Sequence, residues 1–244
     1  IINWSVISVS HFILQTIKGT IEHDFVFHLK KSLDYLNWIY PQGVHTYEFS
    51  DTPIIKNDSF PIGDVPFVLD HLKLNNELNF DKRKPINIPI SLRDVKFTQR
   101  NIVVSPSSLN PFDTNSFVKS NIWYKAFNEL IEPGEFVQHK DSEYFFSEEI
   151  DIDSEWRVFI LNQQIVGLQR YSGDFLAFPD VDFIHNVISN YQNAPGSYTV
   201  DIGINKNSNF LVEIHPFVSC GLYGFADYKI LPEMFIEGIK YLKK

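Results

Sequence analysis

The sequence has one cysteine, no long apolar run and no excess of basic residues. A single cysteine, Cys220, cannot form a disulfide within the chain, which fits a reducing compartment such as the cytoplasm. No stretch of about 18 apolar residues occurs, and polar residues interrupt the opening segment, residues 1–17. The net charge of −9 argues against a general nucleic-acid-binding surface. We therefore expect a soluble, cytoplasmic protein with no membrane partner and no general affinity for nucleic acid.

Two common nucleotide-binding motifs are also missing. Neither G-x-x-x-x-G-K-[ST] nor G-x-G-x-x-G occurs anywhere in the sequence. Their absence excludes a Walker-type phosphate loop and a dinucleotide-binding fingerprint. If the protein binds a nucleotide, another architecture must hold it.

The apolar pattern predicts a mixture of helices and strands. With 244 residues, 44% of them hydrophobic and 15% aromatic, the chain can bury a substantial core. A strand-rich start, a helix over 23–40 and a strand over 44–49 suggest a β-α-β beginning. Asp64 is placed to cap a second helix. The further elements that we expect are helices over 65–78, 123–131, 181–191 and 232–242, and strands over 117–119, 144–150, 155–161, 165–171, 197–204 and 210–215.

Acidic residues interrupt the last two predicted strands. If Ile204 pairs with Phe210, a loop with an odd residue count places Asp201 directly opposite Glu213, with His215 on the same face. Facing carboxylates repel unless a cation or a shared proton lies between them. Oxygen ligands favour Mg²⁺ or Mn²⁺, so the pattern suggests a metal site. The alternative is a solvated hairpin face with incidental charges.

The preceding predicted hairpin carries two arginines. A two- or four-residue loop would place Arg157 and Arg170 on one face, whereas a three-residue loop would separate them. Two guanidinium groups ~5 Å apart at an effective dielectric constant of ~20 repel by roughly 3 kcal/mol before screening, and an anion between them reverses that cost. Arginine binds phosphate bidentately. The alternative is two surface arginines that pair with nearby acids such as Glu155 or Asp174.

Two lysines further upstream are candidates for phosphate binding. Lys119 ends a short predicted strand, and Lys125 follows six residues later. Either ammonium group could hold a phosphate as a point charge. An exposed lysine more often serves solubility alone, so this spacing leaves both possibilities open.

Several segments resemble a known family in their order along the chain. They are PIGDVPFV (61–68), FVK ending at Lys119, KAF (125–127), SEEIDIDSEWR (147–157), Arg170, Asp201, Glu213-x-His215 and CGLYG (220–224). Together they resemble the ATP-grasp superfamily, in particular a clade of small ATP-grasp proteins with two arginines and a lysine. The resemblance extends over roughly residues 60–225, and its most specific segment is 147–157.

The resemblance implies an ATP site. Lys119 would contact the α- and β-phosphates with Lys125 beside them, and Glu155 would bind the ribose. The backbone of Glu148, Glu149 and Ile150 would form the hinge that receives adenine.

The same resemblance implies catalytic and metal-binding roles. Arg157 and Arg170 would face the terminal phosphate or an acylphosphate and act in catalysis. Asp201 and Glu213 would hold Mg²⁺, or alternatively Mn²⁺, with His215 at a position where the family usually has asparagine. Neutral imidazole suits transition metals better than Mg²⁺.

The implied fold is an ATP-grasp fold of the α+β / α/β class. An N-terminal α/β lobe would occupy residues 1–112, a small ATP-grasp subdomain 113–146 and a C-terminal subdomain with the metal site 147–244, the last two clasping ATP. The implied function is an ATP-dependent carboxylate–amine ligase of the peptide-forming type that works through an acylphosphate. Its partners would be ATP, a carboxylate substrate and an amine acceptor, either a small molecule, a peptide or a protein terminus.

Two alternatives to the ligase stay open. His215 and a glycine-poor segment between Lys119 and Lys125 would suit a catalytically weakened ATP-binding pseudoenzyme or interaction module. Direct phosphotransfer to a hydroxyl group would use the same ATP site.

Overall fold

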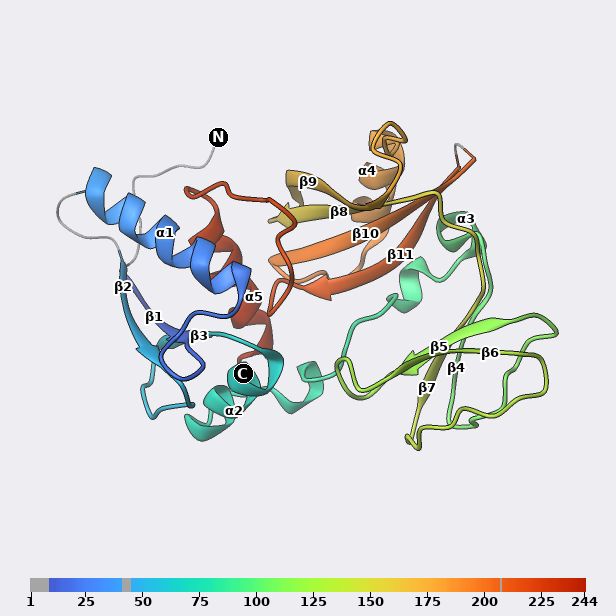
Figure 1. Cartoon of the computed structure of the whole chain (residues 1–244), viewed down its shortest axis with the longest axis horizontal. Helices are drawn as coiled ribbons and strands as arrows, with labels where there is room; N and C mark the ends of the chain where they lie inside the picture. Colours follow the sequence, from blue (N-terminus) through green and yellow to red (C-terminus); the bar gives the residue numbers. More distant parts are fainter. Residues whose placement is uncertain (1–8, 41–44, 207) are drawn as a thin grey trace. The chain divides into compact units, whose positions relative to one another are not determined.

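The computed structural model describes residues 9–40, 45–206 and 208–244, and the chain divides into two compact units. Unit 1 combines the chain up to Phe80 with residues 195–197 and 217–244, and unit 2 combines 81–194 with 198–216 (Figure 1). The division into 1–112, 113–146 and 147–244 is a finer one and stays a prediction. Among the described residues, no helix is both long and apolar enough to cross a membrane.

Unit 1 is built on a parallel sheet in the order β2-β1-β3. Strands β1 (Ser10–Gln15), β2 (His45–Ser50) and β3 (Ser59–Ile62) are accompanied by helices α1 (Asp24–Ile39), α2 (Val65–Leu74) and α5 (Leu231–Leu242). Parallel pairing of β1 and β2 around α1 confirms the predicted β-α-β beginning, although residues 41–44, where we expected the helix to stop, lie outside the described residues. The central strand β1 is buried on both faces, as parallel strands usually are.

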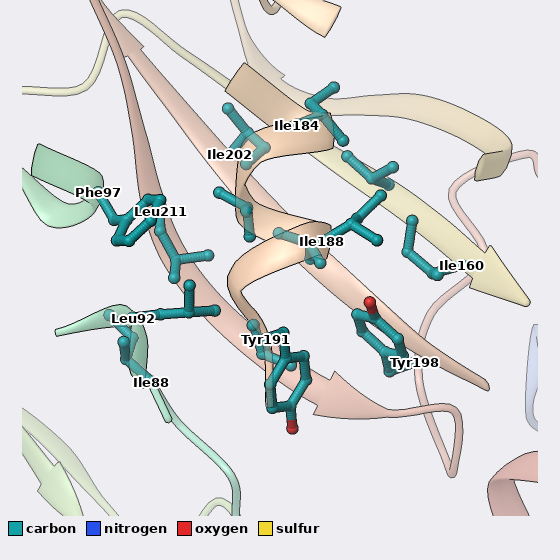
Figure 2. Packing of buried hydrophobic residues seen from close by; sticks show 14 of the residues in the cluster. Ile88, Leu92, Phe97, Ile160, Ile184, Ile188, Tyr191, Tyr198, Ile202 and Leu211 are labelled. Carbon is teal, nitrogen blue, oxygen red and sulfur yellow. The ribbon is translucent and has the colours of Figure 1, made fainter. Parts of the chain in front are cut away.

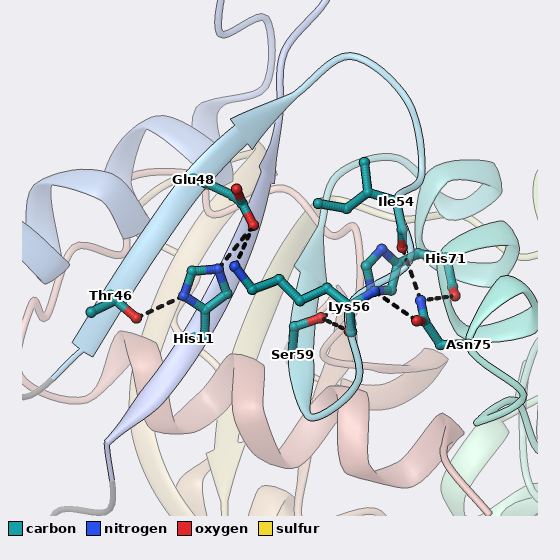
Figure 3. Close-up of polar contacts among 8 residues, drawn as sticks. All are labelled: His11, Thr46, Glu48, Ile54, Lys56, Ser59, His71 and Asn75. Carbon is teal, nitrogen blue, oxygen red and sulfur yellow. Dashed lines mark hydrogen bonds and ion pairs between the residues drawn. The ribbon is translucent and has the colours of Figure 1, made fainter.

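Local contacts explain why unit 1 forms these elements. The Asp64 side chain accepts a hydrogen bond from the Phe67 amide at 2.8 Å, which confirms the predicted cap of α2. Figure 3 shows polar contacts across the strands, where Glu48 accepts from Lys56 at 2.7 Å and lies 3.2 Å from His11. Burial lowers the pKa of His45, at the start of β2, to about 4.

Unit 2 contains two four-stranded sheets. One has the order β4-β7-β5-β6, from β4 (Ile102–Ser105), β5 (Ser116–Ser120), β6 (Asn128–Ile131) and β7 (Tyr144–Glu148). The other has the order β11-β10-β8-β9, from β8 (Ser154–Leu161), β9 (Gln164–Gly173), β10 (Ser197–Asn205) and β11 (Ser208–Pro216). Short helical turns η1 (Phe80–Lys82), η2 (Ile90–Leu92) and α3 (Val95–Thr98) precede the first sheet, and α4 (Val181–Asn190) follows β9.

One predicted helix is wrong. Residues 123–131 form turns followed by strand β6, in which Asn128 pairs with Lys119 of β5. Lys125 has a left-handed φ of 52°, which ends any helical path, and pairing with β5 then overrides the weak helical pattern.

Helix α4 covers one face of the second sheet. Ile184 and Ile188 of α4 pack with Ile202 of β10 and Leu211 of β11 in a buried cluster (Figure 2). Because side chains alternate along a strand, residues next to these apolar positions point to the opposite face of the sheet. That opposite face carries the candidate site.

Candidate functional site

The predicted acid pair is present on strands β10 and β11. Asp201 is the direct cross-strand partner of Glu213, as the sequence predicted. The expected five-residue loop is wrong, because Asn205 already pairs with Ser208, and a bulge at Val212 supplies the missing shift. Bulges commonly redirect a side chain next to a functional site. Here the bulge places Glu213 on the face opposite the core, beside Asp201.

His215 completes a compact group of potential metal ligands. One ligand atom each from Asp201, Glu213 and His215 lies within 4.8 Å of the others. Among the residues that the structure describes, this is the group with the composition and spacing of a metal site. Two ligands on opposite sides of a cation bound at 2.0–2.6 Å are separated by about 4 to 5 Å, so the group fits one ion.

A buried arginine neutralises Asp201. Arg157 of β8 donates from Nε to Oδ1 of Asp201 at 2.8 Å and from Nη2 to Oδ2 at 2.7 Å. The two side chains are 8% and 4% exposed, so this bidentate pair lies almost entirely out of solvent. Its carboxylate oxygens retain further lone pairs that could meet a cation.

Glu213 is also held by cations of the chain. Lys119 of β5 donates to Oε1 of Glu213, and Nε2 of His215 lies 3.0 Å from Oε2. Burial alone would raise the pKa of Glu213, but the charges and hydrogen bonds of His215 and Lys119 outweigh it and hold the pKa well below its usual range. Glu213 is therefore a carboxylate at neutral pH.

The two arginines of the other hairpin do not share a face. The turn has two residues, as one alternative required, and Asn162 and Gln163 both have the positive φ of a type I′ turn. A bulge at Val166 then shifts the register, so that Gln169 is opposite Arg157 and Arg170 is opposite Trp156. The predicted juxtaposition is therefore wrong. Arg170 is exposed and donates to the Gly173 carbonyl at 2.6 Å.

A second bulge brings an unpredicted residue to the site face. At Tyr171 the register shifts again, and its hydroxyl donates to Oε1 of Glu155 at 3.0 Å. The Arg157 guanidinium lies 5.7 Å from the centre of the same ring. Burial raises the pKa of Glu155, and the charge of Asp201 adds to that effect although the bond from Tyr171 opposes it. No pattern in the sequence indicated this contact, since Tyr171 is one aromatic residue among many.

The predicted hinge is tied to neighbouring segments. The amides of Glu148 and Glu149 donate to the carbonyls of Asn101 and Asn115 at 3.1 and 3.0 Å. An adenine base would therefore have to meet other backbone groups of the segment that runs through Ile150. Lys125 is exposed in the loop between β5 and β6, residues 121–127, and is not among the partners of Glu213 described above.

Arg100 is a second buried residue that the sequence did not single out. Its guanidinium donates to Oγ of Ser147 at 2.5 Å and to the carbonyls of Leu211 and Val212 at 3.0 and 3.4 Å. Burial lowers its pKa to about 10, so it stays charged at neutral pH. These bonds reach the bulge next to Glu213. Only a signal for residues far apart in sequence could have revealed them.

Comparisons with known proteins agree with this architecture. The chain is similar to D-alanine–D-alanine ligase from Bacillus anthracis complexed with ATP, with a TM-score of 0.57 and 11% identity over 95% of this chain and 96% of that chain. An ATP-grasp RimK domain protein from Sphaerobacter thermophilus gives 0.56 and 9% identity over 95% and 98%. The ATP-grasp ligase PsnB complexed with a minimal precursor gives 0.53 and 10% identity over 94% and 100%. At these identities the likeness shows the fold alone.

The sequence comparison identifies the family. No curated protein matches the chain. The model of the ATP-grasp domain of the two-arginine, one-lysine clade, family 2, matches residues 97–231, which is more than half of the chain and includes Lys119, Arg157, Asp201 and Glu213. The chain therefore belongs to the ATP-grasp domain proteins of this clade's family 2 and has the ATP-grasp fold.

Proposed function

We propose that this protein is an ATP-dependent ligase that joins a carboxylate to an amine. The observation that carries the proposal is the convergence of Asp201, Glu213 and His215 with the cations Lys119 and Arg157 on one face of unit 2. Acids that can hold a metal and cations that can hold phosphate are the two parts of a metal–nucleotide site. Membership of an ATP-grasp family supports ATP as the nucleotide.

The residues present suit a divalent cation, with Mg²⁺ or Mn²⁺ as the expected ion. Asp201 and Glu213 would hold it through carboxylate oxygens, and His215 would either bind it directly or reach it through water. When bound, the ion would neutralise charge that develops on the phosphates. Thr199, the cross-strand partner of His215, has a buried hydroxyl with no partner among the described residues, and a water on the ion would provide one.

The cations would then change partners. Lys119 and Arg157 now bind Glu213 and Asp201, and each would turn towards the triphosphate once the acids hold the ion. In the proposed reaction a substrate carboxylate oxygen attacks the terminal phosphorus and ADP leaves. The amine then attacks the acyl carbon, loses a proton, and inorganic phosphate leaves. Positioning and charge neutralisation supply the rate enhancement, so no nucleophile of the protein is needed.

One feature favours a second candidate, an ATP-binding module with weak or no catalysis. Both acids at the site are already paired with cations of the chain, and His215 lies 3.0 Å from Glu213 where it competes with a metal. A site that is this well neutralised could bind nucleotide without turnover. Phosphotransfer to a hydroxyl group is retained as an outcome of the test below.

The test is ADP release with Mg²⁺, ATP and a library of carboxylates paired with amines. Release that requires both a carboxylate and an amine, with an amide product, supports the ligase. Binding of Mg²⁺ and ATP without turnover would support the binding module, and a phosphorylated product without an amide would support phosphotransfer. Failure to bind ATP would overturn all three.

A matched pair of variants tests the metal assignment. Glu213→Gln should lower turnover by about 10²-fold or more, because the substitution removes a charged ligand. Glu129 forms a second glutamate–histidine pair, with His139, on strand β6, so Glu129→Gln is the control and should change turnover by less than about threefold. Full activity in both Glu213→Gln and Asp201→Asn would remove the metal from the proposal.

A further inference from the structure

We propose that Asn87 is a positioning residue that holds the loop of residues 121–127 against the strand that carries the metal ligands. Asn87 precedes η2, belongs to unit 2 and is only 1% exposed. Nothing in the sequence pattern marked it as functional. Its contacts connect two parts of the site that are otherwise distant in sequence.

One side of Asn87 is joined to β11 through the backbone. The Ile214 amide donates to the Asn87 carbonyl at 2.7 Å, and the two residues form an isolated antiparallel bridge. Ile214 is fully buried and stands between Glu213 and His215. Fixing its backbone therefore fixes the direction from which both neighbouring side chains leave the strand.

The other side of Asn87 is joined to the loop through its side chain. Nδ2 of Asn87 donates to Oδ1 of Asn121 at 3.0 Å, and Nδ2 of Asn121 donates to the Glu143 carboxylate. A carboxylate can only accept, so this bond sets the orientation of the Asn121 amide and makes its oxygen the acceptor for Asn87. The loop begins two residues after Lys119 and contains Lys125.

Two more contacts from the same segment reinforce the connection. The Tyr124 hydroxyl donates to the Lys84 carbonyl at 3.0 Å, and the Arg83 guanidinium lies 5.4 Å from the centre of the Trp123 ring. Residues 83–87, here called the brace, thus contact the loop at three points and β11 at one. The loop contains no glycine, and the brace gives it a fixed place that does not depend on glycine flexibility.

The backbone of Asn87 shows why asparagine suits the position. Its φ of 54° is left-handed, a conformation that asparagine and glycine adopt more readily than other residues. Glycine at this position keeps the backbone and the Ile214 bond but removes the bond to Asn121. Asn193 has a φ of 56°, is exposed and also belongs to unit 2, so Asn193→Gly makes the same change away from the loop.

The first measurement is amide hydrogen exchange of the protein without nucleotide. Asn87→Gly should speed exchange within residues 121–127 by about threefold to tenfold, the effect of one lost hydrogen bond, while Ile214 and helix α4 keep their protection. Asn193→Gly should leave the loop unchanged. A rise that extends equally to α4 would mean a general loss of stability and would overturn the positioning role.

The second measurement is the affinity for Mg²⁺ with a nonhydrolysable ATP analogue, and this consequence rests on the proposed function. Asn87→Gly and Asn121→Ala should each weaken binding by about threefold to tenfold, and the double variant should be no weaker than either single one. Unchanged loop exchange with affinity within about twofold of the parent would overturn the inference. If the parent protein binds no analogue, the proposed function fails and hydrogen exchange alone decides the role of Asn87.

Discussion

The β8–β9 and β10–β11 hairpins belong to one sheet, and each has two residues between its last paired positions. In β10–β11 a single bulge at Val212 brings Asp201 and Glu213 together. In β8–β9 a bulge at Val166 takes Arg157 and Arg170 apart, and only Arg157 reaches the acids. One extra residue in a strand therefore decides whether like charges meet. Variants of the two hairpins can test that distinction.

The largest expected effect concerns the stability of the two arginine variants. Arg157→Met leaves Asp201 buried without its partner and should lower the free energy of unfolding by about 3 to 5 kcal/mol. Arg170→Met should change it by less than about 0.5 kcal/mol, because Arg170 is exposed. Urea denaturation measures both. The double variant Arg157→Met with Asp201→Leu should recover most of the loss, and equal losses in the two single variants would contradict the assigned register.

Turnover should separate the same two residues. Arg157→Lys should lower kcat/KM by about 10²-fold, since lysine cannot reproduce a bidentate guanidinium contact. Arg170→Lys should lower it by less than about threefold. The assay is ADP release with the carboxylate and amine that support turnover. A large loss in Arg170→Lys would show that β9 rearranges when nucleotide binds.

Acid titration should separate one glutamate from each hairpin. The pKa of Glu213 is depressed, so its stabilisation is present above the usual value of 4.5 and is lost as pH falls through the folded pKa. The pKa of Glu155 is raised, so its charged form opposes folding at neutral pH and that penalty disappears as pH falls from the folded pKa to 4.5.

The measurement is the free energy of unfolding of the metal-depleted protein between pH 7 and pH 3. Glu213→Gln should be less stable than the parent at pH 7, and the difference should narrow below about pH 4.5. Glu155→Gln should lose less stability than Glu213→Gln at pH 7, since it also removes an unfavourable charge. If the two variants followed the same curve, the two carboxylates would not differ in environment.

The smallest expected effect concerns Tyr171. Tyr171→Phe keeps the ring beside Arg157 but removes the hydrogen bond to Glu155, so we expect a loss of about 1 kcal/mol in unfolding free energy. Tyr171→Leu should cost more, because it also removes the ring. Calorimetry or urea denaturation would compare them, and equal effects would leave no separate contribution from the hydroxyl.

The sequence was sufficient for features that depend on local pattern. Helix α4 was predicted at 181–191 and occupies Val181–Asn190, because its apolar spacing is helical and Asp180 caps its first turn. The Asp201–Glu213 pair was predicted from strand alternation alone. Alternation predicts a shared face, but it does not show where an extra residue enters a strand. For this reason the pairing of Arg157 with Arg170 was wrong.

The rest of the site depends on contacts between distant segments. Arg100 reaches carbonyls more than a hundred residues away, and Asn87 joins Asn121 to Ile214. No spacing rule within one strand or helix encodes such contacts, since they depend on how the two sheets of unit 2 pack. The same limit applies to the loop at 121–127, whose place depends on the brace.

The ion pairs at the site have a further consequence for ligand entry. Two carboxylates and two permanently charged cations sum to zero there, although the whole chain carries −9. An arriving metal–nucleotide complex would thus swap existing ionic partners for new ones, with little change in their number. Such an exchange should depend only weakly on ionic strength, unlike the capture of a polyanion by an uncompensated basic cleft.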